Sequence, residues 1–129
     1  GILQREDTLK EIVKLLGPEA LPDEEKLILE VARMIKIGIL QQNSFDDVDT
    51  YCSPEKQFKL MKLQVDFYNK GQQALKDGAS LADIRSMNVI SLLLKARMDV
   101  KDDEMPKLDK IETDMIEQFN SVTGVKVEN

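Results

Sequence analysis

The sequence predicts an all-α fold, a single-domain helical bundle of about five to six helices. Apolar residues recur at the three- and four-residue spacing of a helix face along most of the chain. No segment alternates apolar and polar residues over the length of a strand, and six glycines are few for a chain of β-hairpins. With 42% hydrophobic residues among 129, the chain can build one core of ordinary domain size. We expect residues 1–124 to form this domain and 125–129 to be a flexible tail.

The first two predicted helices are separated by a Gly-Pro break. The first runs from Leu3 to Leu16, and its apolar face consists of Leu9, Ile12, Val13 and Leu16. It closes at Gly17-Pro18, because glycine accepts a positive φ and proline blocks continuation. The second starts at Pro22 and extends to about Gln42, with apolar residues on more than a narrow stripe, so we expect it to be the most buried helix. Its first turn is acidic, where the helix dipole favours negative charge, and contains Asp23, Glu24 and Glu25.

An irregular stretch follows from Asn43 to Tyr51, where the helical period breaks. Ser53 and Pro54 then provide an N-cap and a first helical residue for a long helix to about Lys76, stopped at Gly78. The apolar spacing assigns it an inward face made of Phe58, Met61, Val65, Tyr68 and Leu75.

Three further helices complete the predicted bundle. Ser80 and Asp83 resemble a capping box that opens a short helix from Leu81 to about Met87. Another helix spans roughly 89–98, and a last one spans roughly 104–122, with Pro106 tolerated in its first turn. The last helix has one apolar side, made of Leu108, Ile111, Met115, Phe119 and Val122.

Composition excludes several classes of function. The chain has a net charge of -6, which disfavours binding to nucleic acid or to an anionic membrane surface, and its apolar runs are too short for direct membrane insertion. It has no histidine and a lone cysteine, so imidazole chemistry and an internal disulfide are absent. Its glycines form neither a phosphate-binding nor a dinucleotide-binding loop. We therefore expect no catalytic residue or metal ligand in this chain and no complete cofactor site, since a bound nucleotide would need phosphate ligands from elsewhere.

One acidic cluster allows two interpretations. Asp46, Asp47 and Asp49 have carboxylates that could bind calcium, but the glycine and the closing glutamate of an EF-hand loop are missing. A solvated turn is the alternative that the composition favours.

The stretch from Leu40 to Gln57, which is LQQNSFDDVDTYCSPEKQ, resembles the LQQxxFDxVDTYCxPEKQ segment of the catalytic A subunit of archaeal A-type (A/V-type) rotary ATP synthases. Upstream, GPEALP from Gly17 and VARM from Val31 resemble the family's GPxALP and VARM in the same order. Together these segments lie within a span of about forty positions, from Gly17 to Gln57, and their spacing is consistent with the family. The chain begins at Gly1 without a methionine, and we expect the natural protein to extend upstream.

This resemblance implies a helical C-terminal domain that transmits nucleotide-driven motion to a central stalk, in a proton- or sodium-translocating enzyme. The parent subunit would bind ATP or ADP and Mg²⁺ through an upstream nucleotide-binding domain, and it would alternate with B subunits in a head that is cytoplasmic and peripheral to the membrane. The domain alone would have no active site. The upstream domain, the B subunits and the central-stalk subunits would be its partners.

The resemblance assigns roles to two groups of residues. Phe45 matches an aromatic that lies against the adenine ring, with Asn43 and Ser44 at the edge of the same pocket; a Phe that anchors a turn is an equal alternative. Asp23, Glu24 and Glu25 match in position the acidic region that presses on the rotating stalk, although simple helix capping explains them as well.

Two other classes of function stay open from the residues alone. A free-standing helical module that binds a partner protein would have the same composition and periodicity. A small enzyme that uses only carboxylates would need a converging pair, and the spacing of the acids does not indicate one.

Overall fold

The computed structural model describes residues 1–40 and 53–123, and within these ranges it contains helices and no strand. The all-α prediction is therefore confirmed. The α-helices are α1 (Ile2–Leu16), α2 (Asp23–Ile35), α3 (Pro54–Lys76), α4 (Leu81–Arg85), α5 (Asn88–Asp99) and α6 (Pro106–Thr123). Short 3-10 turns, η1 (Pro18–Ala20) and η3 (Asp102–Glu104), precede α2 and α6, and a π-helical turn, η2 (Lys36–Leu40), continues α2. The predicted tail at 125–129 lies outside the described residues.

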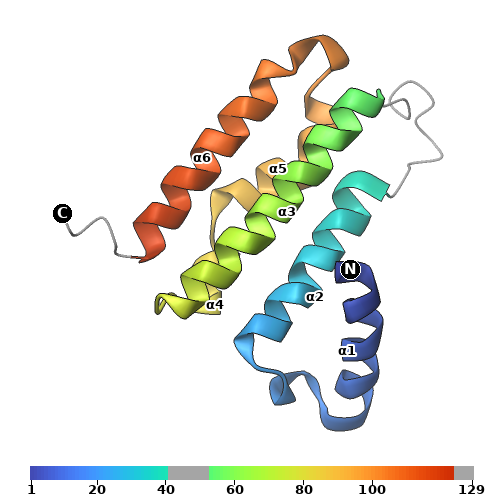
Figure 1. The fold of residues 1–129 in the computed structure, drawn as a ribbon, viewed down its shortest axis with the longest axis vertical. Coiled ribbons are helices and arrows are strands. Elements are labelled where there is room, and N and C mark those ends of the chain that lie inside the picture. Colours follow the sequence, from blue (N-terminus) through green and yellow to red (C-terminus); the bar gives the residue numbers. More distant parts are fainter. Residues whose placement is uncertain (41–52, 124–129) are drawn as a thin grey trace.

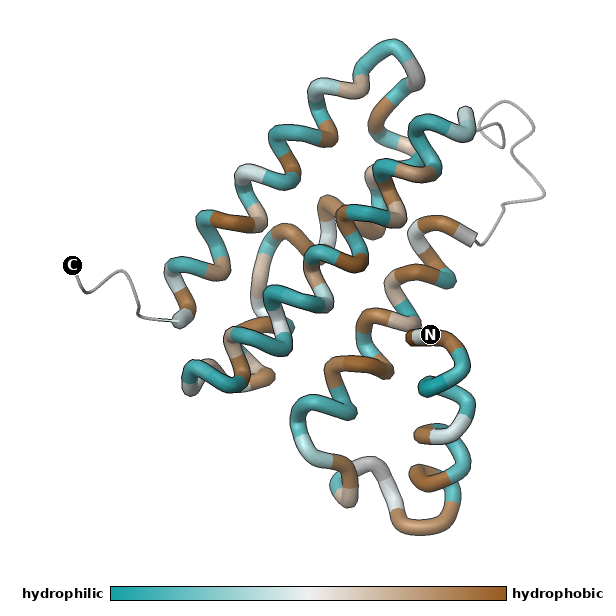
Figure 2. The backbone as a smooth tube through the Cα atoms, viewed as in Figure 1, coloured by the Kyte–Doolittle hydropathy of each residue, from teal (hydrophilic) through white to brown (hydrophobic). Residues whose placement is uncertain are grey.

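The long helix α3 lies at the centre of the molecule (Figure 1). It packs against α2 on one side and against α6 on the other, and α5 contacts all three. Helix α1 folds back onto α2 through the η1 turn, so the two form a helical hairpin at the edge of the bundle. The hydrophobic positions recur along each helix in Figure 2, as expected for amphipathic helices. No helix of the described chain is long and apolar enough to span a bilayer.

The main core forms where α2, α3, α5 and α6 meet. Phe67 of α3 and Phe119 of α6 are buried there, with ring centroids 5.4 Å apart and planes inclined by 59°. A smaller cluster of Leu9, Leu21 and Ile28 holds α1 on α2. Six of the 13 residues of α2 are buried, the largest share among the described helices, so the prediction that this helix is the most buried is confirmed.

Close contact between α2 and α3 depends on a glycine. A β-carbon placed on Gly71 would lie only 2.7 Å from Cδ2 of Leu27, which is fully buried. The missing side chain therefore lets the two helices approach each other at the middle of the bundle.

The predicted helix caps are confirmed. Ser53 caps α3, where its Oγ accepts a hydrogen bond from the Lys56 amide at 3.1 Å. Ser80 and Asp83 form the capping box of α4, in which Ser80 Oγ accepts from the Asp83 amide at 3.0 Å and Asp83 Oδ2 accepts from the Ser80 amide at 3.4 Å. Gly17 and Gly78 adopt positive φ values of 91° and 104°, so glycine is required at both helix ends.

The predicted inward face of α3 is partly wrong. Phe58 is 71% exposed and Val65 is 38% exposed, whereas Met61, Tyr68 and Leu75 are partly buried. The buried apolar residues of α3 are instead Leu60, Leu63, Phe67 and Ala74. Both sets have helical spacing, because α3 carries two apolar stripes, and periodicity cannot choose which stripe meets the neighbouring helices.

Two smaller expectations also need correction. Leu16 was expected on the apolar face of the first helix but is 71% exposed, whereas Leu9 on the same predicted face is buried in the cluster that holds α1 on α2. Pro22 was expected as the first helical residue but is the N-cap of α2, a shift of one position. The end of that helix near Gln42 lies outside the described residues, and the α-helical part stops at Ile35, where η2 begins.

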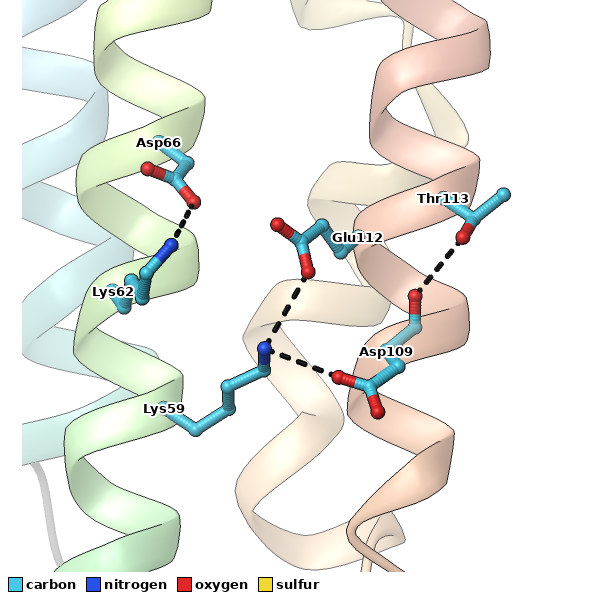
Figure 3. Close-up of polar contacts among 6 residues, drawn as sticks. All are labelled: Lys59, Lys62, Asp66, Asp109, Glu112 and Thr113. Atoms are coloured by element: carbon cyan, nitrogen blue, oxygen red, sulfur yellow. Dashed lines mark hydrogen bonds and ion pairs between the residues drawn. The ribbon is translucent and has the colours of Figure 1, made fainter.

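A charged contact joins α3 to α6 (Figure 3). Lys59 Nζ lies 3.1 Å from Asp109 Oδ1 and 3.4 Å from Glu112 Oε1, two acids one helical turn apart. The hydrogen bond to Asp109 raises the pKa of Lys59 above its ordinary value despite partial burial, and Glu112 adds to the effect. This contact links the N-terminal part of α3 to the N-terminal part of α6.

Candidate functional site

The residues that sequence analysis selected lie at the two ends of α2. The acidic residues 23–25 form its first turn, at the hairpin with α1. The stretch 41–52 begins directly after η2, at the opposite end of the same helix (Figure 1). Asn43, Ser44 and Phe45 belong to that stretch and lie outside the described residues. The site can therefore be built from the hairpin and from the residues that flank 41–52.

The three acids of the first turn have different surroundings. Asp23 and Glu24 are exposed, and their carboxylates make no ion pair within residues 1–40 and 53–123. Glu25 is bound instead, because its Oε2 lies 2.7 Å from Nη2 of Arg5 on α1. The capping interpretation thus fits all three by position, but only two are available to a partner.

Two polar contacts hold the α1–α2 hairpin, one across its turn and one from α3. Lys26 Nζ lies 3.2 Å from Glu19 Oε1 across the η1 turn, and Gln72 of α3 donates to the backbone carbonyl of Glu24 at 3.1 Å. At its tip, Leu15 and Leu16 are 82% and 71% exposed. The hairpin tip therefore presents two exposed leucines and two carboxylates that are unpaired within the described ranges, and Gln72 of α3 contacts its backbone.

Near the other end of α2, η2 lies tightly against α5. A β-carbon on Gly38 would lie 3.2 Å from the carbonyl oxygen of Leu93 and 3.5 Å from Nε2 of Gln64. Gln64 is 1% exposed, and its Oε1 accepts no hydrogen bond from the described part of the chain. Only glycine allows this approach without a shift of the backbone.

The start of α3, which follows the stretch 41–52, is also held on α5. Ser53 caps α3, and Lys56, three residues later, is 3% exposed and donates from Nζ to the carbonyl oxygen of Arg97 at 2.7 Å. That carbonyl lies in the last turn of α5, where the helix dipole favours a cation.

Helix α5 thus anchors both flanks of the stretch 41–52. Gly38 contacts it at Leu93 and Lys56 contacts it at Arg97, one helical turn apart. The two points where the chain leaves and re-enters the described bundle are therefore fixed to the same rigid helix.

A buried carboxylate joins α1 to η2. Glu6 is 4% exposed; its Oε1 lies 2.7 Å from Lys36 Nζ, and its Oε2 lies 3.4 Å from Lys10 Nζ. Burial alone would raise the pKa of Glu6, but the ammonium groups of Lys36 and Lys10 outweigh it and hold the pKa below its ordinary value. Glu6 in turn raises the pKa of Lys36. Lys36 Nζ and Glu6 Oε1 are close enough to form an ion pair, but their geometry does not meet the criteria for a hydrogen bond.

Sequence reasoning missed the residues that position these ends, although three of them carry a signal. Gly38 interrupts an apolar helical run, which often marks a close backbone approach. Lys56 and Glu6 occupy inward positions of amphipathic helices, where a charge needs a partner. Apart from Lys10, which is four residues from Glu6, the partners come from distant parts of the chain, so the sequence does not identify them.

The described residues contain no group of three acidic, thiol or imidazole side chains placed to hold a metal ion. The carboxylates at the hairpin tip belong to one helical turn and face solvent. Their arrangement can attract or repel a charged surface, but it brings no acid and base together for chemistry.

Residues 1–85 match the family described as the C-terminal domain of V and A type ATP synthase. The A subunit of the A-type ATP synthase of Ignicoccus hospitalis is 43% identical over 125 residues, which are 95% of this chain and 21% of the relative. The corresponding A subunit of Staphylothermus marinus is 48% identical over 109 residues, 84% of this chain and 17% of the relative. The V-type ATP synthase alpha chain of Halothermothrix orenii is 37% identical over 119 residues, 92% of this chain and 20% of the relative. The chain therefore spans about a fifth of the length of these relatives.

Proposed function

We propose that this chain, which belongs to the family of C-terminal domains of V and A type ATP synthases, is the force-transmitting, non-catalytic part of a rotary ATP synthase subunit. In this role the domain moves as one body when the nucleotide-binding part of the subunit opens or closes. Its motion is delivered to the central stalk through the α1–α2 hairpin.

The observation that carries this proposal is the placement of α2 and η2. The 13 residues of α2 and the five of η2 run from the hairpin tip to the start of the 41–52 stretch, a span of about 27 Å at 1.5 Å per residue. Six residues of α2 are buried against the bundle, so the helix cannot bend without disturbing the core. A displacement at one end therefore reaches the other with little loss.

At the hairpin we propose that Asp23, Glu24 and the exposed tip residues Leu15 and Leu16 meet the stalk. Exposed ion pairs contribute only about 0–1 kcal/mol each, so the leucines and the shape of the tip supply most of the contact. Glu25 has a structural role, because Arg5 already binds its carboxylate.

At the other end we propose that Phe45 lies against an adenine ring, with Asn43 and Ser44 at the pocket edge. The proposal is supported by the anchoring of both flanks on α5 through Gly38 and Lys56. An aromatic face recognises a flat base through stacking and leaves the phosphates to other groups.

The phosphates and Mg²⁺ of ATP do not fit the described residues, which contain neither a metal-binding cluster nor a glycine-rich loop. We propose that they bind the upstream part of the parent subunit, within the soluble, cytoplasmic head of the complex. The B subunits, the central stalk and the upstream domain are then the partners of this chain.

The test replaces the matching region of the Ignicoccus hospitalis protein with this chain and measures ATP hydrolysis and stalk rotation in the assembled enzyme. Leu15→Asp combined with Leu16→Asp is expected to lower rotation per ATP hydrolysed, while hydrolysis persists. The matched control is Ile116→Asp, a 41% exposed apolar residue on α6. If rotation per ATP hydrolysed were the same in the hairpin variant and the control, the proposed stalk contact would be refuted.

The nucleotide edge is tested in the same chimera. Phe45→Ala is expected to raise KM for ATP about tenfold with a smaller change in kcat. The reason is that the adenine contact would stabilise the bound substrate and the transition state equally. Phe58→Ala, which removes a 71% exposed aromatic of α3, is the control. An unchanged KM in Phe45→Ala would leave the turn-anchoring alternative.

A free-standing interaction module is the second candidate, supported by the exposed apolar side chains at Phe58 and the hairpin tip. Measurable ATP turnover by the isolated chain would contradict both candidates. Failure of the chimera to assemble, together with a native fold of the isolated chain, would favour the module.

A further inference from the structure

A groove of about 640 Å³ runs between α1 and the α2–η2 segment, on the outer side of the hairpin. Its volume is that of a typical ligand-binding cleft. Each wall contributes residues at the same spacing: positions 6, 10, 13 and 14 from α1, and positions 29, 33, 36 and 37 from α2 and η2. This spacing of four, three and one is that of one helix face over two turns. The groove is therefore a trough about 12 Å long between two helices.

The floor of the trough is aliphatic. Val13 and Leu29 are half-buried, and Ile37 is 44% exposed, although all three point to the same groove. In helical bundles, a third helix packs into an apolar groove of this kind between two neighbouring helices. No helix of the described bundle packs into this trough.

The rim of the trough is basic on both sides. Lys10 and Lys14 line it on α1, and Arg33 and Lys36 line it on the opposite wall. This concentration of positive charge contrasts with the net charge of -6 of the whole chain. A surface of this sign selects an acidic partner by electrostatic complementarity.

Local acids neutralise the rim only in part. Glu6 is shared by Lys10 and Lys36, and Lys14 has a pair with Glu11 at 3.5 Å in which both side chains are more than 70% exposed. Arg33 binds Glu30 at 2.8 Å. Four cations thus share three carboxylates, and the Lys14 pair is open to exchange with an incoming acid.

We propose that this trough binds an acidic amphipathic α-helix of a partner protein, with the apolar seam of that helix on Val13, Leu29 and Ile37. Glutamates or aspartates on both flanks of the seam then meet the two basic walls. This is the helix-in-groove mode of recognition, with charges beside the seam to fix orientation. Glu6 sets the width of the trough at one end, because it joins α1 to Lys36 of the opposite wall.

The probe is a synthetic helix of about 15 residues, long enough to populate a helix, with leucines along one seam and glutamates on both flanks. A second peptide has the same seam with lysine flanks, and a third has the acidic composition scrambled so that no seam forms. Each is titrated into the isotope-labelled chain, and Kd and amide shift changes are measured by NMR. The acidic seam peptide is expected to bind with shifts confined to α1, α2 and η2, and at least about tenfold tighter than the lysine version.

Two variants and a matched control locate the binding site. Lys14→Glu is expected to raise Kd about three- to tenfold, and Ile37→Asp by more than about tenfold. Lys110→Glu on α6 is the control, since its side chain is 78% exposed and pairs with Asp114 at 3.6 Å, much as Lys14 pairs with Glu11. Unchanged unfolding transitions in all three variants confirm that the bundle is intact.

Several outcomes would overturn the proposal. Equal affinity of the lysine-flanked peptide would mean that the trough binds apolar peptides without regard to their charge. Equal affinity of the scrambled peptide would mean that binding depends on charge alone. Equal loss in Lys14→Glu and Lys110→Glu would place binding elsewhere. Binding to phosphatidylglycerol vesicles that Lys14→Glu abolishes, without peptide binding, would assign the trough to a membrane surface instead.

Discussion

Replacement of Glu6 by glutamine tests the contact that joins α1 to the rest of the bundle. Glu6 is the only acidic side chain that is buried among the described residues. Glutamine keeps its shape and one acceptor oxygen but removes the charge that faces Lys36 at 2.7 Å and Lys10 at 3.4 Å. The change therefore isolates the electrostatic part of the contact.

The expected cost is about 1.5–3 kcal/mol of unfolding free energy at pH 7, the range for hydrogen bonds to charged groups. It stays below the cost of breaking a fully buried ion pair, because Lys36 and Lys10 are about half exposed and regain water when the carboxylate is lost. The matched control is Glu11→Gln, one turn further along α1, whose carboxylate is 71% exposed and 3.5 Å from Lys14. Its expected effect is below about 0.5 kcal/mol.

The assay is urea unfolding of both proteins across a pH series. The folded pKa of Glu6 is lowered, so its contribution is fully present above the unfolded pKa of about 4.3 and is lost as pH falls through the folded value. The difference between the natural chain and Glu6→Gln should therefore be constant near neutral pH, shrink below about pH 4, and approach zero in stronger acid. The other carboxylates are common to both proteins and cancel.

The opposite pattern would refute this reasoning. If Glu6→Gln were as stable as the natural chain at pH 7, or more stable, burial of the carboxylate would outweigh its two ammonium partners. A difference that grows as pH falls would likewise mean that the folded pKa is raised.

The remaining predictions concern packing and one buried cation, and each is checked by chemical denaturation. Lys56→Met keeps the apolar stem but loses the hydrogen bond to the Arg97 carbonyl, and it should cost about 1.5–3 kcal/mol; a cost below about 0.5 kcal/mol would show that the amine is dispensable. Phe67→Ala should cost about 3–5 kcal/mol, since the ring is fully buried; a cost under about 1 kcal/mol would contradict the described core. Gly71→Ala should destabilise the natural chain, because its β-carbon meets Leu27 at 2.7 Å, yet stabilise a Leu27→Ala background, where helix propensity alone acts at about 1 kcal/mol. If the effects of Gly71→Ala and Leu27→Ala on the unfolding free energy were additive, a side chain at position 71 would not contact Leu27.

Local features of this protein could be predicted from the sequence because they depend on neighbours in the chain. The helical period, the caps at Ser53 and Ser80, and the glycine stop at Gly78 involve atoms only a few residues apart. The resemblance in the 40–57 stretch also lies in the sequence itself, and the match of residues 1–85 confirms the family. The roles of Phe45, Asn43 and Ser44 stay predictions, as do those of Asp23, Glu24 and Glu25.

Tertiary structure alone decided which surfaces meet. Helix α3 has two apolar stripes of equal period, and only packing against α2, α5 and α6 buries Phe67 and exposes Phe58. Likewise Lys36, the nearer of the two ammonium partners of Glu6, is 30 residues away in the chain, and the carbonyl that Lys56 binds is 41 residues away. Periodicity places a residue on a face of its own helix, but burial and charge pairing depend on distances between helices, and these exist only once the chain has folded.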